Sequence, residues 1–249
     1  MNADSIYFAT DDYIRAASDP QLSSPDSHLL TTLLSEEDQH EYNQLLHVQL
    51  TSDVLNIVNQ LTSLFHISSS AIWMSMVLLK KLPVESNSFN LLAIIACVTL
   101  SCKYQDSPSQ VIDYELIAQC YSIEDVRLIQ NAEIELLEYF EYDICVATPD
   151  HFFSYLINLT ADDVKSKQAI EQARSVFFMN FLSNERADLF YNYPSSIVTL
   201  SFIYNIASNK TFIMEQMKSF LVHKKDPSHY FKQLLLCTDL LQSCNVING

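Results

Sequence analysis

LLAIIACVTL, residues 91–100, decides how this chain folds, because it is apolar on every face when it is drawn as a helix. Such a helix has no face for water, so in a water-soluble domain other helices must surround it. We expect it to begin at Ser88, to run to Cys102 and to be the central helix of the first half of the chain. The run is too short to span a bilayer.

The segments around this run have helical periodicity and residues that begin or end helices. A helix at about 28–46 is expected first, and Thr51 to Asp53 can cap the next one. Ser68 to Ser70 can cap the third, which must stop at Pro83, and Ser122 to Asp125 resemble a capping box. The helices expected to surround the central one cover residues 54–66, 70–82, 111–121 and 125–140.

The same scheme starts again after Pro149. Ser195 to Ala207 is the most apolar of the later segments, so it should be a second central helix. The expected fold class is all-α, with two five-helix domains in tandem and no residue-by-residue repeat. We expect an arm over 1–26, a first domain over 27–147 that includes the preceding helix, and a second over 148–249. The helices of the second half are expected near residues 150–159, 163–182, 194–208, 211–223 and 227–244.

Composition limits the classes of partner. The chain has 30 acidic and 14 basic residues and a net charge of −16, which argues against nucleic acid and against an acidic membrane surface. Hydrophobic residues make up 49 % and charged residues 18 %, so some of the apolar surface should meet a partner protein. Six cysteines without a Cys-x-x-Cys pair, and an N-terminus without a signal peptide, predict an intracellular protein of the nucleus or cytoplasm.

Enzyme signatures are missing from the sequence. Gly249 is the single glycine, so neither a nucleophile elbow nor a phosphate-binding loop can form. The seven histidines include no His-Glu-x-x-His motif. We therefore expect a non-enzymatic protein with no metal, cofactor or small-molecule ligand.

One carboxylate lies in the middle of an apolar helix face. At 100° per residue, Glu133 falls within about 60° of Val126, Ile129, Leu136, Leu137 and Phe140. An ionised carboxylate there costs several kcal/mol (order of magnitude) unless it is paired. The candidate cation that we expect to pair with it is Lys103, at the exit of the helix over 91–102. Spacing leaves three readings open: an ion pair that serves the fold alone, a Glu133 that reaches solvent, and a pair that binds a partner.

The residues around this pair resemble the cyclin box. The resemblance is carried by Leu91 to Tyr104, which ends in Ser-Cys-Lys-Tyr, by the helix that contains Glu133, and by Phe140 to Ile144 followed by Thr148-Pro149. The spacing between these features is similar to that in cyclins, without a large gap. Residues 191–197, Tyr-Asn-Tyr-Pro-Ser-Ser-Ile, look like the cyclin segment before the second central helix, so the resemblance covers roughly residues 28–245.

The resemblance implies a tandem cyclin fold and a regulatory subunit that activates a cyclin-dependent protein kinase in a heterodimer, promoting cell-cycle progression. In cyclins a Lys and a Glu hydrogen-bond the kinase beside its C-helix, and the resemblance places them at Lys103 and Glu133. Packing on the C-helix holds its Glu against the ATP-binding Lys, and the kinase performs the chemistry. The apolar kinase-binding residues that it implies are Leu100, Tyr104, Leu137, Tyr142 and Ile144.

One part of the pattern departs from cell-cycle cyclins. Their first box helix carries Met-Arg-Ala-Ile-Leu and a following Trp, which form a groove for Arg-x-Leu peptides. Here Ile57 stands at the Trp position, and Gln60 stands where an acidic residue is common. We expect weak docking of such substrates and inhibitors. A two-box chain with this groove and no Leu-x-Cys-x-Glu motif is similar to cyclins of gammaherpesviruses. The groove residues are Leu50, Thr51, Val54, Ile57 and Gln60.

Two other readings remain. The cyclin fold of general transcription factors binds DNA, but its basic faces are not present in this sequence. A helical adaptor that binds a partner without activating it would share the apolar surface and the acidic charge, and the sequence does not separate it from a cyclin.

Overall fold

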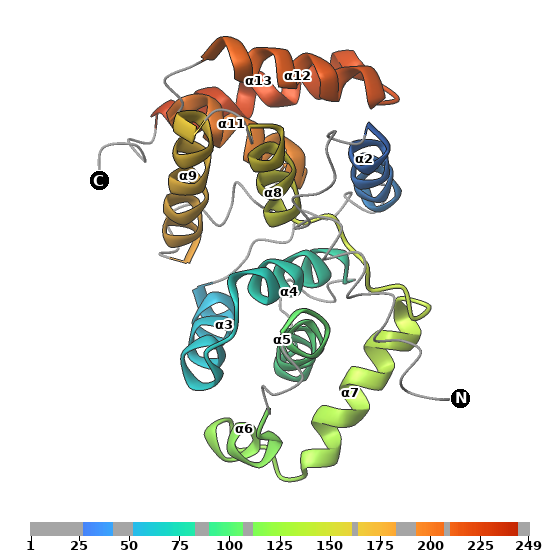
Figure 1. Ribbon diagram of the computed structural model, residues 1–249. Helices are drawn as coiled ribbons and strands as arrows, with labels where there is room; N and C mark the ends of the chain where they lie inside the picture. The colour runs from blue at the N-terminus through green and yellow to red at the C-terminus, as the bar shows by residue number, and fades with distance from the viewer. Residues whose placement is uncertain are drawn as a thin grey trace. The chain divides into compact units, whose positions relative to one another are not determined.

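A computed structural model describes residues 27–41, 52–82, 90–106, 112–160, 164–182, 193–206 and 210–243. Every regular element in these ranges is an α-helix, so the predicted all-α class is confirmed (Figure 1). The predicted arm over 1–26 lies outside the described residues. The helices are α2 (Ser27–Glu41), α3 (Ser52–Phe65), α4 (Ser69–Lys81), α5 (Leu91–Gln105), α6 (Tyr114–Cys120), α7 (Val126–Tyr139), α8 (Pro149–Leu159), α9 (Val164–Leu182), α11 (Ser195–Ile206), α12 (Lys210–His223) and α13 (Pro227–Ser243).

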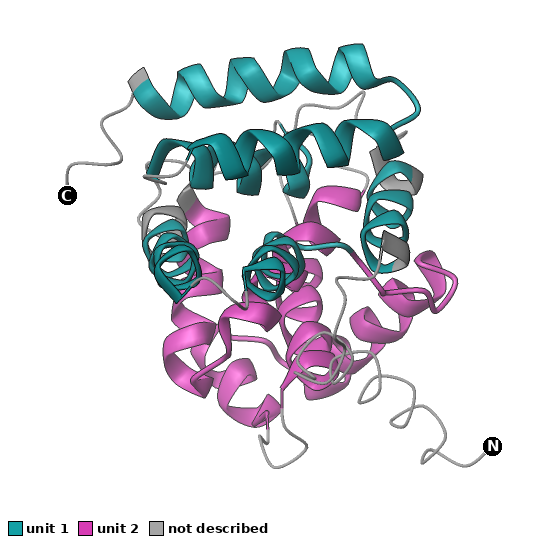
Figure 2. Cartoon of the chain, turned by 45° about the horizontal axis from the view of Figure 1, so that its top comes forward, with its two compact units in different colours: residues 1–42, 147–249 teal, residues 43–146 magenta. Residues whose placement is uncertain are grey.

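The chain divides into two compact units, one of residues 43–146 and one of residues 1–42 with 147–249 (Figure 2). Helix α2 therefore groups with the second half of the chain, whereas we expected it within a first domain of residues 27–147. The reason is a buried side chain. Glu37 of α2 accepts hydrogen bonds from Ser196 and Lys224, which lie more than 150 residues further along the chain.

Helix α5 is the central helix of the unit of residues 43–146. All nine residues from Ile94 to Cys102 are buried, and α5 packs against α3, α4 and α7, which Figure 1 shows around it. This arrangement confirms the interpretation of the apolar run. The helix begins at Leu91 rather than at Ser88, because the Asn90 side chain caps it by accepting a hydrogen bond from the Leu92 amide.

Three helices of this unit end in the same way, at a residue with a left-handed backbone. These residues are His66, directly after α3, and Ser122 and Glu141, which follow the C-cap residues of α6 and α7; their φ values are 51°, 54° and 52°. The next amide in each case bonds the carbonyl five residues before it, the hydrogen bond of a Schellman motif. Glycine is the usual residue at this position, so a chain with one glycine uses other residues at some cost.

One of the predicted helix starts is confirmed and one is wrong. Ser68 caps α4 as expected, and its side chain accepts a hydrogen bond from the Ala71 amide at 3.2 Å. The capping box over 122–125 is wrong, because Ser122 belongs to the turn that ends α6. Asp125 alone caps α7, through the Arg127 amide at 2.8 Å.

Helix α11 is the central helix of the other unit. Its residues from Ser195 to Ile203 are buried, and it packs against α8, α9, α12 and α13, while α2 packs on α8 and α12. Aromatic rings fill the space between these helices, including a Phe177–Phe202 pair with centroids 4.9 Å apart. Like α5, this helix has no face for water and is covered on every side.

Candidate protein-binding site around Lys103 and Glu133

The Glu133 carboxylate of α7 accepts hydrogen bonds from side chains of two other helices, α5 and α6. On α5, Thr99 and Lys103 are four residues apart and so lie on one face. Tyr114 is the first residue of α6, and Glu133 is on α7. Thr99 Oγ1 donates to Glu133 Oε1 at 2.5 Å, Tyr114 OH donates to the same oxygen at 2.8 Å, and Lys103 Nζ donates to Oε2 at 2.6 Å.

Burial of the two charges in this cluster is unequal. The Glu133 side chain is 7 % exposed, whereas that of Lys103 is 46 % exposed. The ammonium also lies 5.0 Å from the centroid of the Tyr114 ring. Each carboxylate oxygen accepts a hydrogen bond from this chain, and these bonds offset the free energy of removing the charge from water. The predicted pairing of Glu133 with Lys103 is present, and Glu133 does not reach out to solvent.

Tyr114 is held in its protonated form. Burial, followed by the charge of Glu133 and the hydrogen bond to it, raises the pKa of the phenol far above its usual value. The hydroxyl is therefore protonated at neutral pH and can donate to Glu133. Sequence reasoning missed both Tyr114 and Thr99, although the i, i+4 spacing of Thr99 and Lys103 could have indicated the threonine.

The geometry suits binding better than chemistry. Glu133 is surrounded by donors of its own chain, so its oxygens are poorly placed to take a proton from a substrate. An ammonium has three N–H donors, and the bond to Glu133 uses one of them. Glu133 therefore fixes the position of the Lys103 ammonium, and the other two N–H groups can donate to a partner protein. Among the described residues no group of three His, Cys, Asp or Glu side chains could hold a metal ion.

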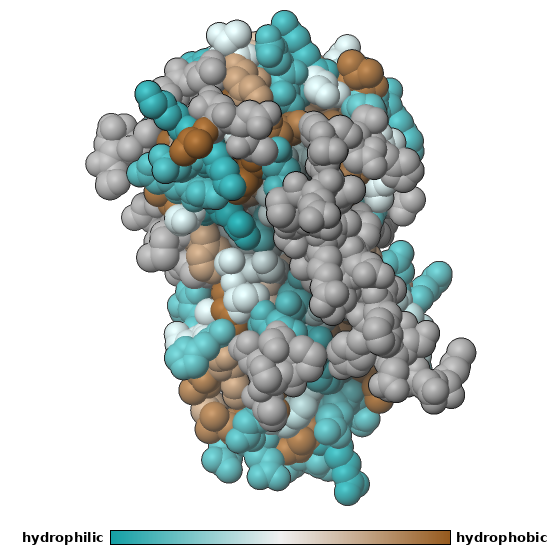
Figure 3. Space-filling model, in the orientation of Figure 1, coloured by the Kyte–Doolittle hydropathy of each residue, from teal (hydrophilic) through white to brown (hydrophobic). Residues whose placement is uncertain are grey.

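The remaining predicted kinase-binding residues differ in how much surface they present. Leu100 and Ile144 are buried, at 6 % and 9 % exposed, and belong to the core. Tyr104 and Leu137 are partly exposed, and Tyr142 is 68 % exposed. The visible face of this unit mixes apolar and hydrophilic residues (Figure 3). Three of the five predicted apolar residues therefore have side-chain surface with which a partner could make contact.

The predicted docking groove is only partly described. Leu50 and Thr51 lie outside the described residues. Val54 is buried, Ile57 is partly exposed and Gln60 is exposed on α3. Gln60 Oε1 accepts a hydrogen bond from Tyr121 OH at 3.1 Å, a contact that sequence reasoning missed. This bond uses one of the two lone pairs of the Gln60 carbonyl, so one remains for a peptide donor.

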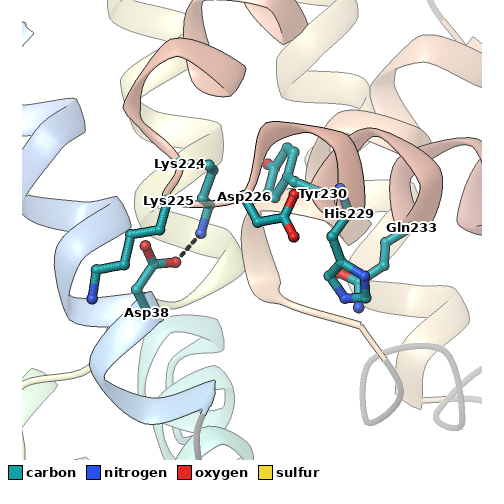
Figure 4. Close-up of a pocket in the computed structure, with 7 residues that line it drawn as sticks. All are labelled: Asp38, Lys224, Lys225, Asp226, His229, Tyr230 and Gln233. Atoms are coloured by element: carbon teal, nitrogen blue, oxygen red, sulfur yellow. Dashed lines mark hydrogen bonds and ion pairs between the residues drawn. The ribbon is translucent and has the colours of Figure 1, made fainter.

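A second charged cluster, in the unit of residues 1–42 and 147–249, was not predicted. Lys224 Nζ donates to Glu37 Oε2 at 2.9 Å and to Asp38 Oδ1 at 2.5 Å, and its side chain is 4 % exposed. Burial lowers the pKa of Lys224, but the charges and hydrogen bonds of Glu37 and Asp38 raise it by more. Figure 4 shows the residues that line the adjoining pocket of about 260 Å³, among them His229 and Gln233.

Fold and site together define a class of protein: an all-helical chain of two compact units, in which a buried carboxylate forms an ion pair with a half-exposed lysine. No model of a known family matches the chain, and no curated protein matches it. No helix in the described ranges is long and apolar enough to cross a membrane.

Proposed function

We propose that this chain is a cyclin, a regulatory subunit that binds a cyclin-dependent Ser/Thr protein kinase and activates it by packing on the kinase C-helix. The single observation that supports this most is the Lys103–Glu133 pair. The resemblance assigns the kinase contact to these two residues, and their charged atoms lie 2.6 Å apart.

The physical basis of the proposal is that the site is rigid before a partner arrives. Glu133 is anchored by Thr99 and Tyr114, so Lys103 loses little side-chain freedom when it donates to a kinase carbonyl. A lysine without such an ion pair would lose more side-chain freedom on binding. Activation then comes from binding energy that favours the active position of the C-helix, not from chemistry on this chain.

The apolar part of the proposed contact consists of Tyr104, Leu137 and Tyr142, whose side chains have exposed surface. Tyr142 offers the largest surface, and the backbone that carries it is held by the Schellman bond from its amide to Leu137 at 2.7 Å. Tyr104 and Leu137 add smaller surfaces. Leu100 and Ile144 are buried, so they would support this surface from the core and make little contact with the kinase themselves.

An activation assay tests the proposal. Purified chain is mixed with inactive monomeric cyclin-dependent kinases, and histone phosphorylation and complex formation are both measured. We use Lys103→Met, which removes the charge but keeps the apolar stem, and expect binding to weaken by about 2 kcal/mol or more, roughly thirtyfold. Glu133→Gln, with nearly the same shape, should weaken binding because Lys103 is then less firmly held.

A matched control separates the site from a general loss of charge. Lys210 of α12 lies 4.9 Å from the Tyr204 ring centroid, much as Lys103 lies over Tyr114, but it belongs to the other unit. Lys210→Met should leave activation unchanged. Binding without activation would favour the helical adaptor, and no binding to any member of the kinase family would refute the cyclin proposal.

A further inference from the structure

The outer face of α13 carries four large apolar side chains. The helix buries one side, through Tyr230, Leu234, Cys237 and Leu241. The four on the other side are Phe231, Leu235, Leu236 and Leu240, which are 39 %, 50 %, 49 % and 42 % exposed. Figure 2 shows α13 as the helix of its unit that leads to the C-terminus. One helix that exposes four such side chains is typical of an interaction surface.

Two charges lie along the centre line of this face. Lys232 and Asp239 are both exposed, and seven residues place them within about 20° of each other around the helix and about 10 Å apart along it. They are therefore too far apart to pair with each other. Neither forms an ion pair with any of the described residues.

The face is self-complementary about its midpoint. The point between Leu235 and Leu236 is equally far in sequence from Lys232 and Asp239, and also from Phe231 and Leu240. When two copies of α13 pack antiparallel about a two-fold axis at this point, each Lys232 faces the other copy's Asp239. The same axis sets Leu235 near Leu235 and Leu236 near Leu236 of the other copy, while Phe231 and Leu240 lie at opposite edges of the contact.

We propose that the outer face of α13 is a self-association surface on which a second copy of this chain packs antiparallel. The two charges favour a second copy in the antiparallel orientation. In a parallel pair, Lys232 would face Lys232 and Asp239 would face Asp239, and these like charges would repel each other. The proposal rests on α13 alone and does not depend on the proposed kinase activation.

The face is small compared with a stable protein–protein interface. A helix of 17 residues is about 26 Å long and about 10 Å wide, so one face covers a few hundred Å² in each copy. A stable interface of standard size buries about 800 Å² in each partner. Because the face is smaller than this, we expect a weak dimer that forms only at high protein concentration.

Sedimentation equilibrium of the full chain between about 10 μM and 1 mM tests the proposal, in 0.15 M salt so that the Debye length is about 8 Å. We expect the wild type to shift from monomer to dimer over this range. Lys232→Asp and Asp239→Lys should each weaken the dimer at least tenfold, because each sets like charges opposite each other twice. The double variant Lys232→Asp/Asp239→Lys should restore wild-type association.

Net charge is controlled in this series. Asp239→Lys changes the net charge from −16 to −14, which reduces general repulsion between copies, so weaker association in this variant can only be local. Lys218→Asp, at an exposed position of α12, makes the same change in charge as Lys232→Asp and should have no comparable effect. A wild type that stays monomeric up to 1 mM, single variants that dimerise normally, or a double variant that is not restored would each overturn the proposal.

Discussion

Replacing Lys224 by methionine should destabilise this protein far more than replacing Lys103 in the same way. Both lysines pair with a glutamate, Glu37 for the first and Glu133 for the second. They differ in burial, because the Lys224 side chain is 4 % exposed and the Lys103 side chain is 46 % exposed. Lys224 also pairs with Asp38, so the two lysines differ in burial and in the number of ion pairs, and burial should account for the larger part of the difference.

The loss of stability expected for Lys224→Met depends on the buried Glu37 carboxylate, which then has no cation beside it. Removal of one partner of a buried pair costs roughly 3–5 kcal/mol, because the other charge stays buried without compensation. Glu37 keeps the Ser196 amide, at 2.8 Å, and the Ser196 hydroxyl as donors. Ser196 is the second residue of α11, so Glu37 also faces the positive end of that helix. These contacts place our expectation at the lower end, about 3 kcal/mol.

The magnitude for Lys103 is smaller. Water reaches its ammonium and screens the pair, and exposed pairs contribute within about 1 kcal/mol. Glu133 also keeps Thr99 and Tyr114 as donors when the lysine is gone. In 0.5 M salt the loss for Lys103→Met should shrink further, because salt screens exposed charges, whereas the loss for Lys224→Met should persist.

Urea unfolding with two signals checks both expectations. Circular dichroism at 222 nm follows all helices, while fluorescence of Trp73, the one tryptophan of the chain, follows the unit of residues 43–146. With a slope of about 2–3 kcal/mol/M in urea, 3 kcal/mol corresponds to a midpoint shift of about 1 M in the dichroism transition of the Lys224→Met variant. The Trp73 midpoint of Lys103→Met should move by less than about 0.5 M.

Lys225 supplies the matched control, since it is the exposed neighbour of Lys224 in sequence. Lys225→Met should leave the urea midpoint within about 0.2 M of the wild type. The reasoning would be refuted by a Lys224→Met loss no greater than that of Lys103→Met. A Lys225→Met loss equal to that of Lys224→Met would also refute it, because general charge and not burial would then be responsible.

Three further predictions concern helix ends, pH and thiols. Ser122→Gly should raise the free energy of unfolding by about 0.5–1 kcal/mol, because φ at this position is 54°; a lower urea midpoint would contradict the left-handed backbone. Stability should fall as pH rises above about 10, because burial and Glu133 raise the folded pKa of Tyr114 and the unfolded state therefore loses its proton first. Titration by dichroism should find a smaller fall in Tyr114→Phe, and an equal fall would argue against this site. Exposed Cys120 should react with a thiol reagent at least about tenfold faster than buried Cys97, whose pKa burial raises; mass spectrometry of labelled peptides would show the reverse order if the burial is wrong.

Part of the candidate site could be read from sequence because it depends on helical geometry alone. The 100° step places Glu133 in an apolar stripe, and an ionised group there needs a cation. Lys103, at the exit of the apolar helix, was the expected cation, and the structure places its Nζ 2.6 Å from the carboxylate. Tyr114 could not be found in this way, because its hydroxyl reaches Glu133 only after α6 has packed against α7.

Local chemistry in the sequence also misled in one instance. Ser122 and Asp125 are both good N-cap residues, and the pattern alone favours the first as part of a capping box. The helix begins after the second, because Ser122 has a left-handed backbone and closes the Schellman motif of α6. The end of one helix and the start of the next compete for the same four residues, and packing settles the result.

The sequence by itself determined that this chain is built of helices and that its two most apolar segments, α5 and α11, lie at the centre of their units, because a helix without a polar face must be covered. Only the tertiary structure decided where α2 belongs. Glu37 binds Ser196 and Lys224 across 159 and 187 residues of chain. Periodicity and capping act over a few residues, so a pairing at that distance leaves no local trace and arises only when the helices pack.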